Sequence, residues 1–184
     1  MQYVIGVRSM DNYYVSLGIN IKGKKINNWR IGTRIREEYK HKWLYHNEIE
    51  VTNSLDDTVF YKLPIDNSTG KVLLSGLGLG ILPNTLAKLD KIESILVVEK
   101  SSEVIAMIEP YILSDKITII NQDILEYIPE EEFDYAFIDI WSQDNKDNRA
   151  EEEKIILNNL EDKIIKIDFC QSYNEALKYY NGSD

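Results

Sequence analysis

The sequence predicts an α/β fold, a mainly parallel sheet with helices on both faces, preceded by a small antiparallel β appendage. Three observations predict it. From Lys71 onward, short apolar runs alternate with helical patterns, which is typical of parallel sheets. A glycine-rich turn follows the first apolar run, where a parallel strand passes into its helix. Residues 1–70 differ, because Tyr13–Ile21 alternates polar and apolar side chains and is followed by a turn and further strand-like stretches, which favours antiparallel strands.

The core, residues 71–184, is expected to hold its strands in the order 3-2-1-4-5. Apolar runs predict these strands at Lys71–Ser75, Ser94–Glu99, Lys116–Ile120, Phe133–Ile140 with a buried centre at Tyr135–Ile138, and Lys163–Phe169. Helical spacing predicts helices at Gly80–Asp90, Ser101–Leu113, about Asn148–Leu160 and around Tyr173–Tyr180. Ser101 or Ser102 is the expected N-cap of the second helix. Only fifteen residues follow Phe169, so a sixth and a seventh strand are expected to be missing.

The appendage, residues 1–70, is expected to be rich in β-strands. Strand-like patterns lie at Tyr13–Ile21, Glu48–Val51 and Thr58–Tyr61, with a turn at Lys22–Lys24. Between them, residues 29–43 are rich in Arg, Lys and aromatic residues, and Ile31–Tyr45 is expected to be a short helix or an irregular loop. This basic-aromatic segment contacts an anionic substrate under one interpretation, and is a solvated face or an oligomer contact under the other.

Composition and charge exclude several classes of protein. The chain has 184 residues, 43% of them hydrophobic, which indicates one folded domain with its own core. No run approaches the roughly 20 apolar residues of a membrane span. No export signal begins the sequence, so a cytoplasmic protein is expected. The net charge of −10 argues against nucleic acid as a general partner, while assembly into a homo-oligomer stays open.

Few residues offer metal or redox chemistry. The only histidines, His41 and His46, are five positions apart and do not share one helical face, so no metal site is expected. The single Cys170 allows no internal disulfide and no thiolate metal cluster within one chain. A buried, inert thiol is the expected state of this cysteine.

The most informative motif is the glycine turn Gly76-x-Gly78-x-Gly80, which follows the first core strand. Glycines there let the chain turn sharply and let backbone amides approach a ligand, although such turns also occur for packing alone. The dinucleotide motif G-x-G-x-x-G fails, because its third glycine would fall on Ile81 or Pro83. A nucleoside ligand without a pyrophosphate is therefore favoured.

Carboxylates follow the neighbouring strands at the same sheet edge. Glu99 ends the second strand, where it can accept hydrogen bonds from both hydroxyls of a ribose. Asp123 follows the third strand and either accepts from an adenine amine or forms a turn. Asp139 ends the fourth strand, in a position to hold a ligand's amino group or to orient a nucleophile. Trp141 is either an aromatic wall beside a sulfonium or a packing residue.

Taken together, the run GLGLG…VVEKSSEVI…NQDILEYI…FDYAFIDIW resembles the class I S-adenosylmethionine-dependent methyltransferase superfamily, and within it spermidine synthase-like proteins. The resemblance covers about residues 70–142, and the appendage is similar to the small β domain of aminopropyltransferases. It implies a Rossmann-like core. By this resemblance Gly76, Gly78 and Gly80 border the methionine portion of the cofactor, Glu99 the ribose, Asp123 and Ile124 the adenine, and Asp139 the reacting end, as the catalytic residue.

The resemblance implies an S-adenosylmethionine-binding transferase, most simply a methyltransferase acting on a small or medium acceptor. One alternative is aminopropyl transfer from decarboxylated S-adenosylmethionine to an amine, although aminopropyltransferases have an Asp where this chain has Ser142. Another is a nucleoside-binding or interaction protein without catalysis. Both enzymatic interpretations predict that Glu99→Ala and Gly78→Val abolish ligand binding in a protein that stays folded.

Overall fold

The computed structural model describes residues 21–36, 39–53, 57–141, 148–170 and 178. The elements of the appendage are β1 (Lys24–Ile26), β2 (Trp29–Arg36), β3 (Tyr39–His46) and β4 (Ile49–Asn53). The elements that follow are α2 (Asp57–Asn67), β5 (Gly70–Ser75), α3 (Ile81–Leu86), β6 (Ile92–Glu99), α4 (Ser102–Ile108), η1 (Glu109–Tyr111), β7 (Ile117–Asn121), β8 (Tyr135–Ile138), α5 (Arg149–Leu160), η2 (Glu161–Lys163) and β9 (Ile167–Phe169).

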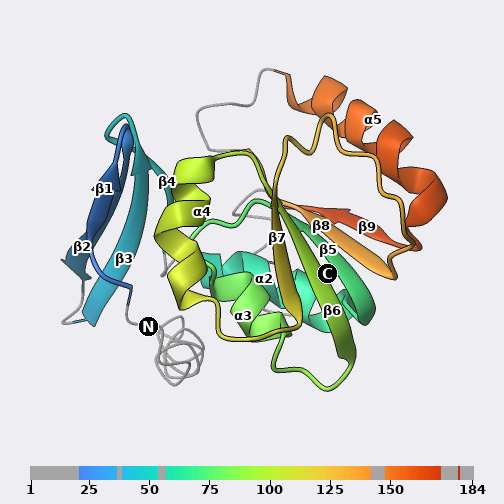
Figure 1. Ribbon diagram of the computed structural model, residues 1–184, viewed down its shortest axis with the longest axis horizontal. Coiled ribbons are helices and arrows are strands. Elements are labelled where there is room, and N and C mark those ends of the chain that lie inside the picture. The colour runs from blue at the N-terminus through green and yellow to red at the C-terminus, as the bar shows by residue number, and fades with distance from the viewer. Residues whose placement is uncertain (1–20, 37–38, 54–56, 142–147, 171–177, 179–184) are drawn as a thin grey trace.

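The core is a five-stranded sheet in the order β7-β6-β5-β8-β9, and every neighbouring pair is parallel. This is the predicted order 3-2-1-4-5. Side chains from α3 and α4 belong to the hydrophobic cluster on one face, and Ile156 and Leu160 of α5 to the cluster on the other (Figure 1). The predicted α/β fold with helices on both faces is therefore confirmed.

The predicted boundaries hold at some helices and fail at others. Ser101 is the N-cap of α4, because its side chain accepts a hydrogen bond from the Val104 N–H at 3.2 Å. The helix predicted over Ser101–Leu113 ends at Ile108 and continues as the 3₁₀ turn η1, where Pro110 offers no backbone N–H. The helix α3 is likewise shorter than the predicted Gly80–Asp90.

The appendage is a four-stranded antiparallel sheet in the order β1-β2-β3-β4. The interpretation of Ile31–Tyr45 as a helix or loop is wrong, because β2 and β3 form a hairpin there. Ile31 pairs with Leu44, and both are almost fully buried, at 3% and 1% exposure. Apolar side chains spaced along this charged segment therefore join the core, which favours the extended chain over a helix.

The strand predicted at Thr58–Tyr61 is also wrong, since these residues begin the helix α2. Their β-branched and aromatic side chains favour strands locally. In the folded chain, Tyr61 is buried and Phe60 and Leu63 pack on the same cluster as α3 and α4. Burial against residues distant in sequence thus outweighs the local preference.

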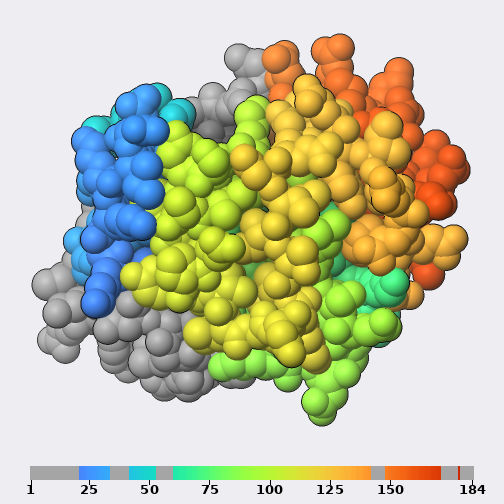
Figure 2. Space-filling view, viewed as in Figure 1, coloured from blue at the N-terminus to red at the C-terminus, as the bar shows by residue number. Residues whose placement is uncertain are grey.

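The appendage packs directly on the helix α4 (Figures 1 and 2). Asn27 Nδ2 donates to Glu103 Oε1 at 2.9 Å, and Lys24 Nζ donates to the Ala106 carbonyl at 3.1 Å. Ile31 and Leu44 share one hydrophobic cluster with the core. Thr52 of β4 is the residue nearest to a Cβ built on Gly78, so the antiparallel sheet also lies beside the glycine turn that precedes α3.

Some predictions concern residues outside the described ranges. These are the strand at Tyr13–Ile21 except for its last residue, the helix around Tyr173–Tyr180 except for residue 178, and the missing sixth and seventh strands. Among the helices described, none combines the length and apolar character needed to cross a bilayer.

Candidate functional site

The glycine turn lies between β5 and α3, at the carboxyl end of the central strand. All three glycines have positive φ, at +90° for Gly76, +52° for Gly78 and +71° for Gly80. A Cβ on Gly76 would lie 2.5 Å from the Asp139 carbonyl oxygen, and one on Gly80 would lie 2.8 Å from a side-chain atom of Ile108. Packing within the chain therefore accounts for the first and third glycines.

Gly78 differs from its two neighbours in the turn. A Cβ there would meet only Thr52 Cγ2 of β4, at the ordinary contact distance of 3.6 Å. Within the part of the chain that the structure describes, the N–H groups of Gly78 and Leu79 make no hydrogen bond. A glycine with room for a Cβ, beside two free donors, is the arrangement that a close ligand approach requires.

The carboxylate of Glu99 bonds directly to the turn. Its Oε2 accepts from the Leu77 N–H at 2.8 Å, and its Oε1 accepts from the Ser101 N–H at 2.8 Å. Burial raises the pKa of the Glu99 carboxyl, and these backbone hydrogen bonds oppose that rise. Each carboxylate oxygen has two acceptor sites, so capacity remains for hydroxyl groups of a ligand.

The predicted adenine residues follow the next strand. Asp123 Oδ1 accepts from the Leu125 N–H at 3.1 Å, which is the turn that the sequence left as an alternative. Its Oδ2 forms an ion pair with Lys100 Nζ at 2.8 Å. Partial burial opposes ionisation, but Lys100 and the Leu125 N–H outweigh it and hold the pKa of Asp123 below its ordinary value. Ile124 is buried at 3% exposure, so its side chain belongs to the core beneath this edge.

Asp139 follows β8 and lies across from the turn. Its N–H donates to the Ser75 carbonyl at 3.2 Å, which ties it to the residue before Gly76. Burial raises the pKa of the Asp139 carboxyl, while a hydrogen bond from the Cys170 thiol and the charge of Arg149 oppose the rise. Cys170 is half-buried, so the expectation of a fully buried thiol is wrong, and its side chain lies beside this carboxyl.

Trp141 is engaged by the helix α5. The Arg149 guanidinium lies over its ring at 4.6 Å from the centroid, and its Nε1 donates to Glu152 Oε2 at 2.6 Å. The Phe169 ring packs at 5.8 Å. These contacts give Trp141 the packing role that the sequence allowed, and a role beside a sulfonium stays a prediction.

Sequence reasoning missed two residues that organise this edge. Asn121 Nδ2 donates to the carbonyls of Glu99 and Lys100, at 3.0 and 2.9 Å. Lys100 forms the ion pair with Asp123. The sequence did contain a signal for these two residues. Each is a polar residue at or just after the end of one of two neighbouring parallel strands, and the parallel topology brings such side chains together.

The basic-aromatic segment and the histidines belong to the hairpin β2–β3. The rings of His46 and Trp29 stack with centroids 4.5 Å apart. Arg30 covers the Tyr45 ring at 4.1 Å and pairs with Glu48 at 2.7 Å. The His41 side chain lies outside the described residues. Within the described ranges no three His, Cys, Asp or Glu side chains are grouped to hold a metal ion.

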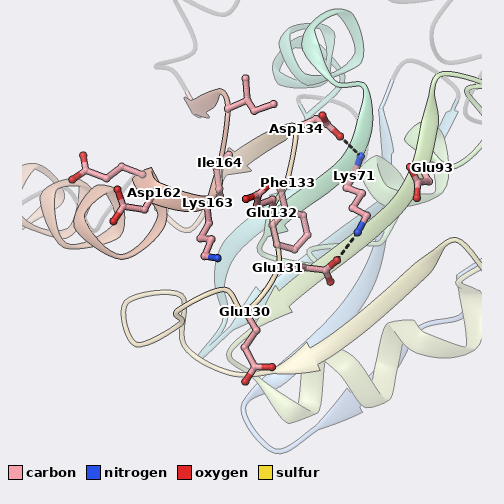
Figure 3. A pocket seen from close by; sticks show the side chains of 12 residues that line it. Lys71, Glu93, Glu130, Glu131, Glu132, Phe133, Asp134, Asp162, Lys163 and Ile164 are labelled. Atoms are coloured by element: carbon pink, nitrogen blue, oxygen red, sulfur yellow. Dashed lines mark hydrogen bonds and ion pairs between the residues drawn. The ribbon is translucent and has the colours of Figure 1, made fainter.

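A hollow of about 610 Å³ lies at the opposite end of the sheet (Figure 3). It is lined by Lys71, Glu93, Glu130–Asp134 and Glu161–Ile165, which precede or begin strands. Lys71 pairs there with Glu131 at 2.9 Å. Ligands of open parallel sheets bind outside the carboxyl ends of the strands, so the glycine turn, and not this hollow, is the candidate site.

Comparisons with solved structures test the fold. A spermidine synthase in complex with the transition-state analogue AdoDATO matches with a TM-score of 0.54 and 19% identity, over 76% of this chain and 52% of that one. Spermidine synthase from Thermotoga maritima matches with a TM-score of 0.51 and 21% identity, over 66% and 48%. An S-adenosylmethionine-dependent methyltransferase from Clostridium acetobutylicum matches at 0.47 and 17%, over 60% and 47%.

The chain thus spans about half the length of these solved structures. No family model matches the sequence, and no curated protein matches it. The match over 76% of the chain is longer than residues 71–184 alone can supply, so it includes part of the appendage. The motif resemblance is supported at the level of the fold, because the chain has the Rossmann-like fold of the two solved spermidine synthases.

Proposed function

We propose that this chain binds S-adenosylmethionine and transfers a group from it, most simply a methyl group, to a small or medium acceptor. The carrying observation is the hydrogen bond from the Leu77 N–H to Glu99 Oε2, at 2.8 Å. This hydrogen bond joins the glycine turn after β5 to the partly buried carboxylate of Glu99 at the end of β6. A nucleoside with a charged tail requires this combination of free amide donors and a hydroxyl acceptor.

The residues present fit such a ligand. The N–H groups of Gly78 and Leu79, which have no hydrogen-bond partner among the described residues, suit the carboxylate of a methionine portion. Glu99 suits the ribose hydroxyls, and Asp123 suits the amine of the base. S-adenosylmethionine, when bound, supplies a carbon already activated by a sulfonium. The chain then mainly has to position the acceptor in line with that carbon.

Asp139 is proposed as the catalytic residue. It lies at the edge where β5 and β8 end, next to the glycine turn. Burial raises the pKa of its carboxyl, and the Cys170 thiol and the charge of Arg149 oppose this rise without cancelling it. A carboxyl group in this state can hold the ligand's amino group or orient an acceptor.

The second candidate is aminopropyl transfer from decarboxylated S-adenosylmethionine to an amine. The observation that favours it is the extent of the match to a spermidine synthase structure, which reaches into the appendage. The position where the resemblance expects a further Asp is Ser142, which lies outside the described residues. A binding protein without catalysis is the third candidate.

Isothermal titration tests these candidates directly. The full chain is titrated with S-adenosylmethionine, S-adenosylhomocysteine, decarboxylated S-adenosylmethionine and NAD. We expect micromolar binding of the first two and none of NAD. Preference for the decarboxylated form would replace methyl transfer by aminopropyl transfer. Binding without turnover of any amine, thiol or hydroxyl acceptor would favour the third candidate, and no binding would overturn the proposal.

Substitution of Gly78 tests the turn itself. The structure makes Gly78→Ala a milder probe than valine, because its Cβ meets only Thr52. We expect a loss of about 1 kcal/mol in unfolding free energy from the positive φ, and at least about tenfold weaker S-adenosylmethionine binding from the added methyl group. Gly76→Ala serves as the contrast, since its Cβ would overlap the Asp139 carbonyl oxygen and should lower the unfolding free energy more than Gly78→Ala does. Unchanged affinity in Gly78→Ala would remove the turn from the site.

A further inference from the structure

Polar side-chain and backbone hydrogen bonds link the carboxyl ends of β6 and β7. Asn121 Nδ2 donates to the carbonyls of Glu99 and Lys100, at 3.0 and 2.9 Å, and the Gln122 N–H donates to the Glu99 carbonyl at 3.1 Å. Lys100 Nζ also forms an ion pair with Asp123 Oδ2 at 2.8 Å. The two predicted nucleoside-binding carboxylates, Glu99 and Asp123, therefore sit on one rigid unit.

The Lys100–Asp123 ion pair adds little to the stability of the fold. The Lys100 side chain is 76% exposed, and the Asp123 side chain 24%. Pairs this open to water contribute little, because solvent screens them and a long side chain loses entropy. What the pair does is orient a carboxylate: Lys100 holds Oδ2, and the Leu125 N–H holds Oδ1 at 3.1 Å.

The oriented group has a definite hydrogen-bonding character. An ionised carboxylate only accepts hydrogen bonds, and each oxygen of Asp123 has one acceptor site left. Lys100 and the Leu125 N–H also hold the pKa of Asp123 low, which keeps the group ionised. A fixed acceptor beside the ribose acid Glu99 selects a base that carries an amino group.

We propose that Lys100 is a positioning residue for base recognition, which fixes the Asp123 carboxylate so that it accepts a hydrogen bond from the 6-amino group of a purine nucleoside. This inference rests on the proposed function. It assigns Lys100 a role through Asp123 and no contact with the reacting atoms. Asn121 supports it by holding the Lys100 backbone.

The test compares two ligands with three proteins. The ligands are S-adenosylhomocysteine and its 6-deamino analogue, in which purine replaces adenine. The proteins are the wild type, Lys100→Met, and the control Lys71→Met, which removes a lysine from a similar ion pair at the opposite end of the sheet. Kd values come from isothermal titration, and urea unfolding checks that each variant folds.

We expect the wild type and Lys71→Met to bind S-adenosylhomocysteine about tenfold more tightly than the deamino analogue, since a hydrogen bond to a charged group is lost. Lys100→Met should reduce this preference to about twofold, by weakening the adenine ligand and not the analogue. A merely structural role would weaken both ligands equally and would overturn the inference. Equal binding of both ligands by the wild type would also overturn it. Binding of neither by the wild type would instead overturn the proposed function.

Discussion

Glu99→Ala is expected to weaken S-adenosylmethionine binding by at least about 100-fold, because the hydrogen bonds that we propose from two ribose hydroxyls to this carboxylate are lost together. The variant should also lose about 1–3 kcal/mol of unfolding free energy, since the Leu77 and Ser101 N–H groups lose their acceptor. The structure thereby changes the expectation from sequence alone, in which this substitution left the fold untouched.

The two effects of Glu99→Ala can be separated by a milder variant and a control. Glu99→Gln keeps the shape and one acceptor oxygen, so it should fold more stably than the alanine variant and still bind weakly. Glu93→Ala removes the same side chain from the other end of β6, where Glu93 is exposed. Titration and urea unfolding are measured for all three. Wild-type affinity in a folded Glu99→Ala protein would show that Glu99 holds only the backbone.

Asp139→Asn is expected to have opposite effects on activity and stability. Transfer should fall by about 100-fold or more, because the variant loses the carboxyl group that we propose orients the reacting end. The unfolding free energy at neutral pH should rise, because burial raises the pKa of Asp139 and asparagine carries no charge to bury. A gain in stability together with this loss of transfer would separate a catalytic role of Asp139 from a merely structural one.

The pH dependence follows from the direction of that pKa shift. An unfolded Asp ionises near pH 3.9, approximately, and the folded carboxyl ionises higher. The contribution of Asp139 to stability is therefore fully present below the unfolded pKa and is lost as the pH rises through the folded pKa. The stability gained by Asp139→Asn should be absent below about pH 4, grow as the pH rises, and become constant once the pH passes the folded pKa of Asp139.

Urea unfolding of wild type and variant at several pH values measures this difference. Asp162→Asn is the matched control, because it makes the same charge change at an exposed position at the other end of the sheet. It should change neither transfer nor the pH dependence. Full transfer activity in Asp139→Asn would remove Asp139 from the reacting end, and a constant stability difference from pH 4 to 8 would contradict the raised pKa of its carboxyl.

The core could be predicted from sequence because its signals are local. Each parallel strand is a short apolar run, and the turn after β5 contains glycines that only a positive φ or a close contact explains. The N-cap at Ser101 is likewise set by a contact three residues away, to Val104. Once the strand order was inferred, topology alone placed Glu99, Asp123 and Asp139 at one edge of the sheet.

The appendage was harder to predict, because its structure depends on contacts distant in sequence. Ile31 and Leu44 are strand residues because both pack into a cluster that contains residues of α3 and α4. Tyr61 is helical although its neighbours favour strands, for the same reason. Short segments with mixed charge and aromatic residues have no dominant local preference, so tertiary burial decides them.

At the candidate site, too, some features follow from the sequence and others only from the tertiary structure. By itself the sequence determined which residue types stand at the carboxyl ends of the strands, and hence the kind of ligand that the edge suits. Only the tertiary structure decided which of those groups are already engaged: Glu99 by the turn, Asp123 by Lys100, and Trp141 by Arg149. The physical reason is that hydrogen bonds and ion pairs between strand ends depend on angstrom-scale distances, which periodicity and spacing do not encode.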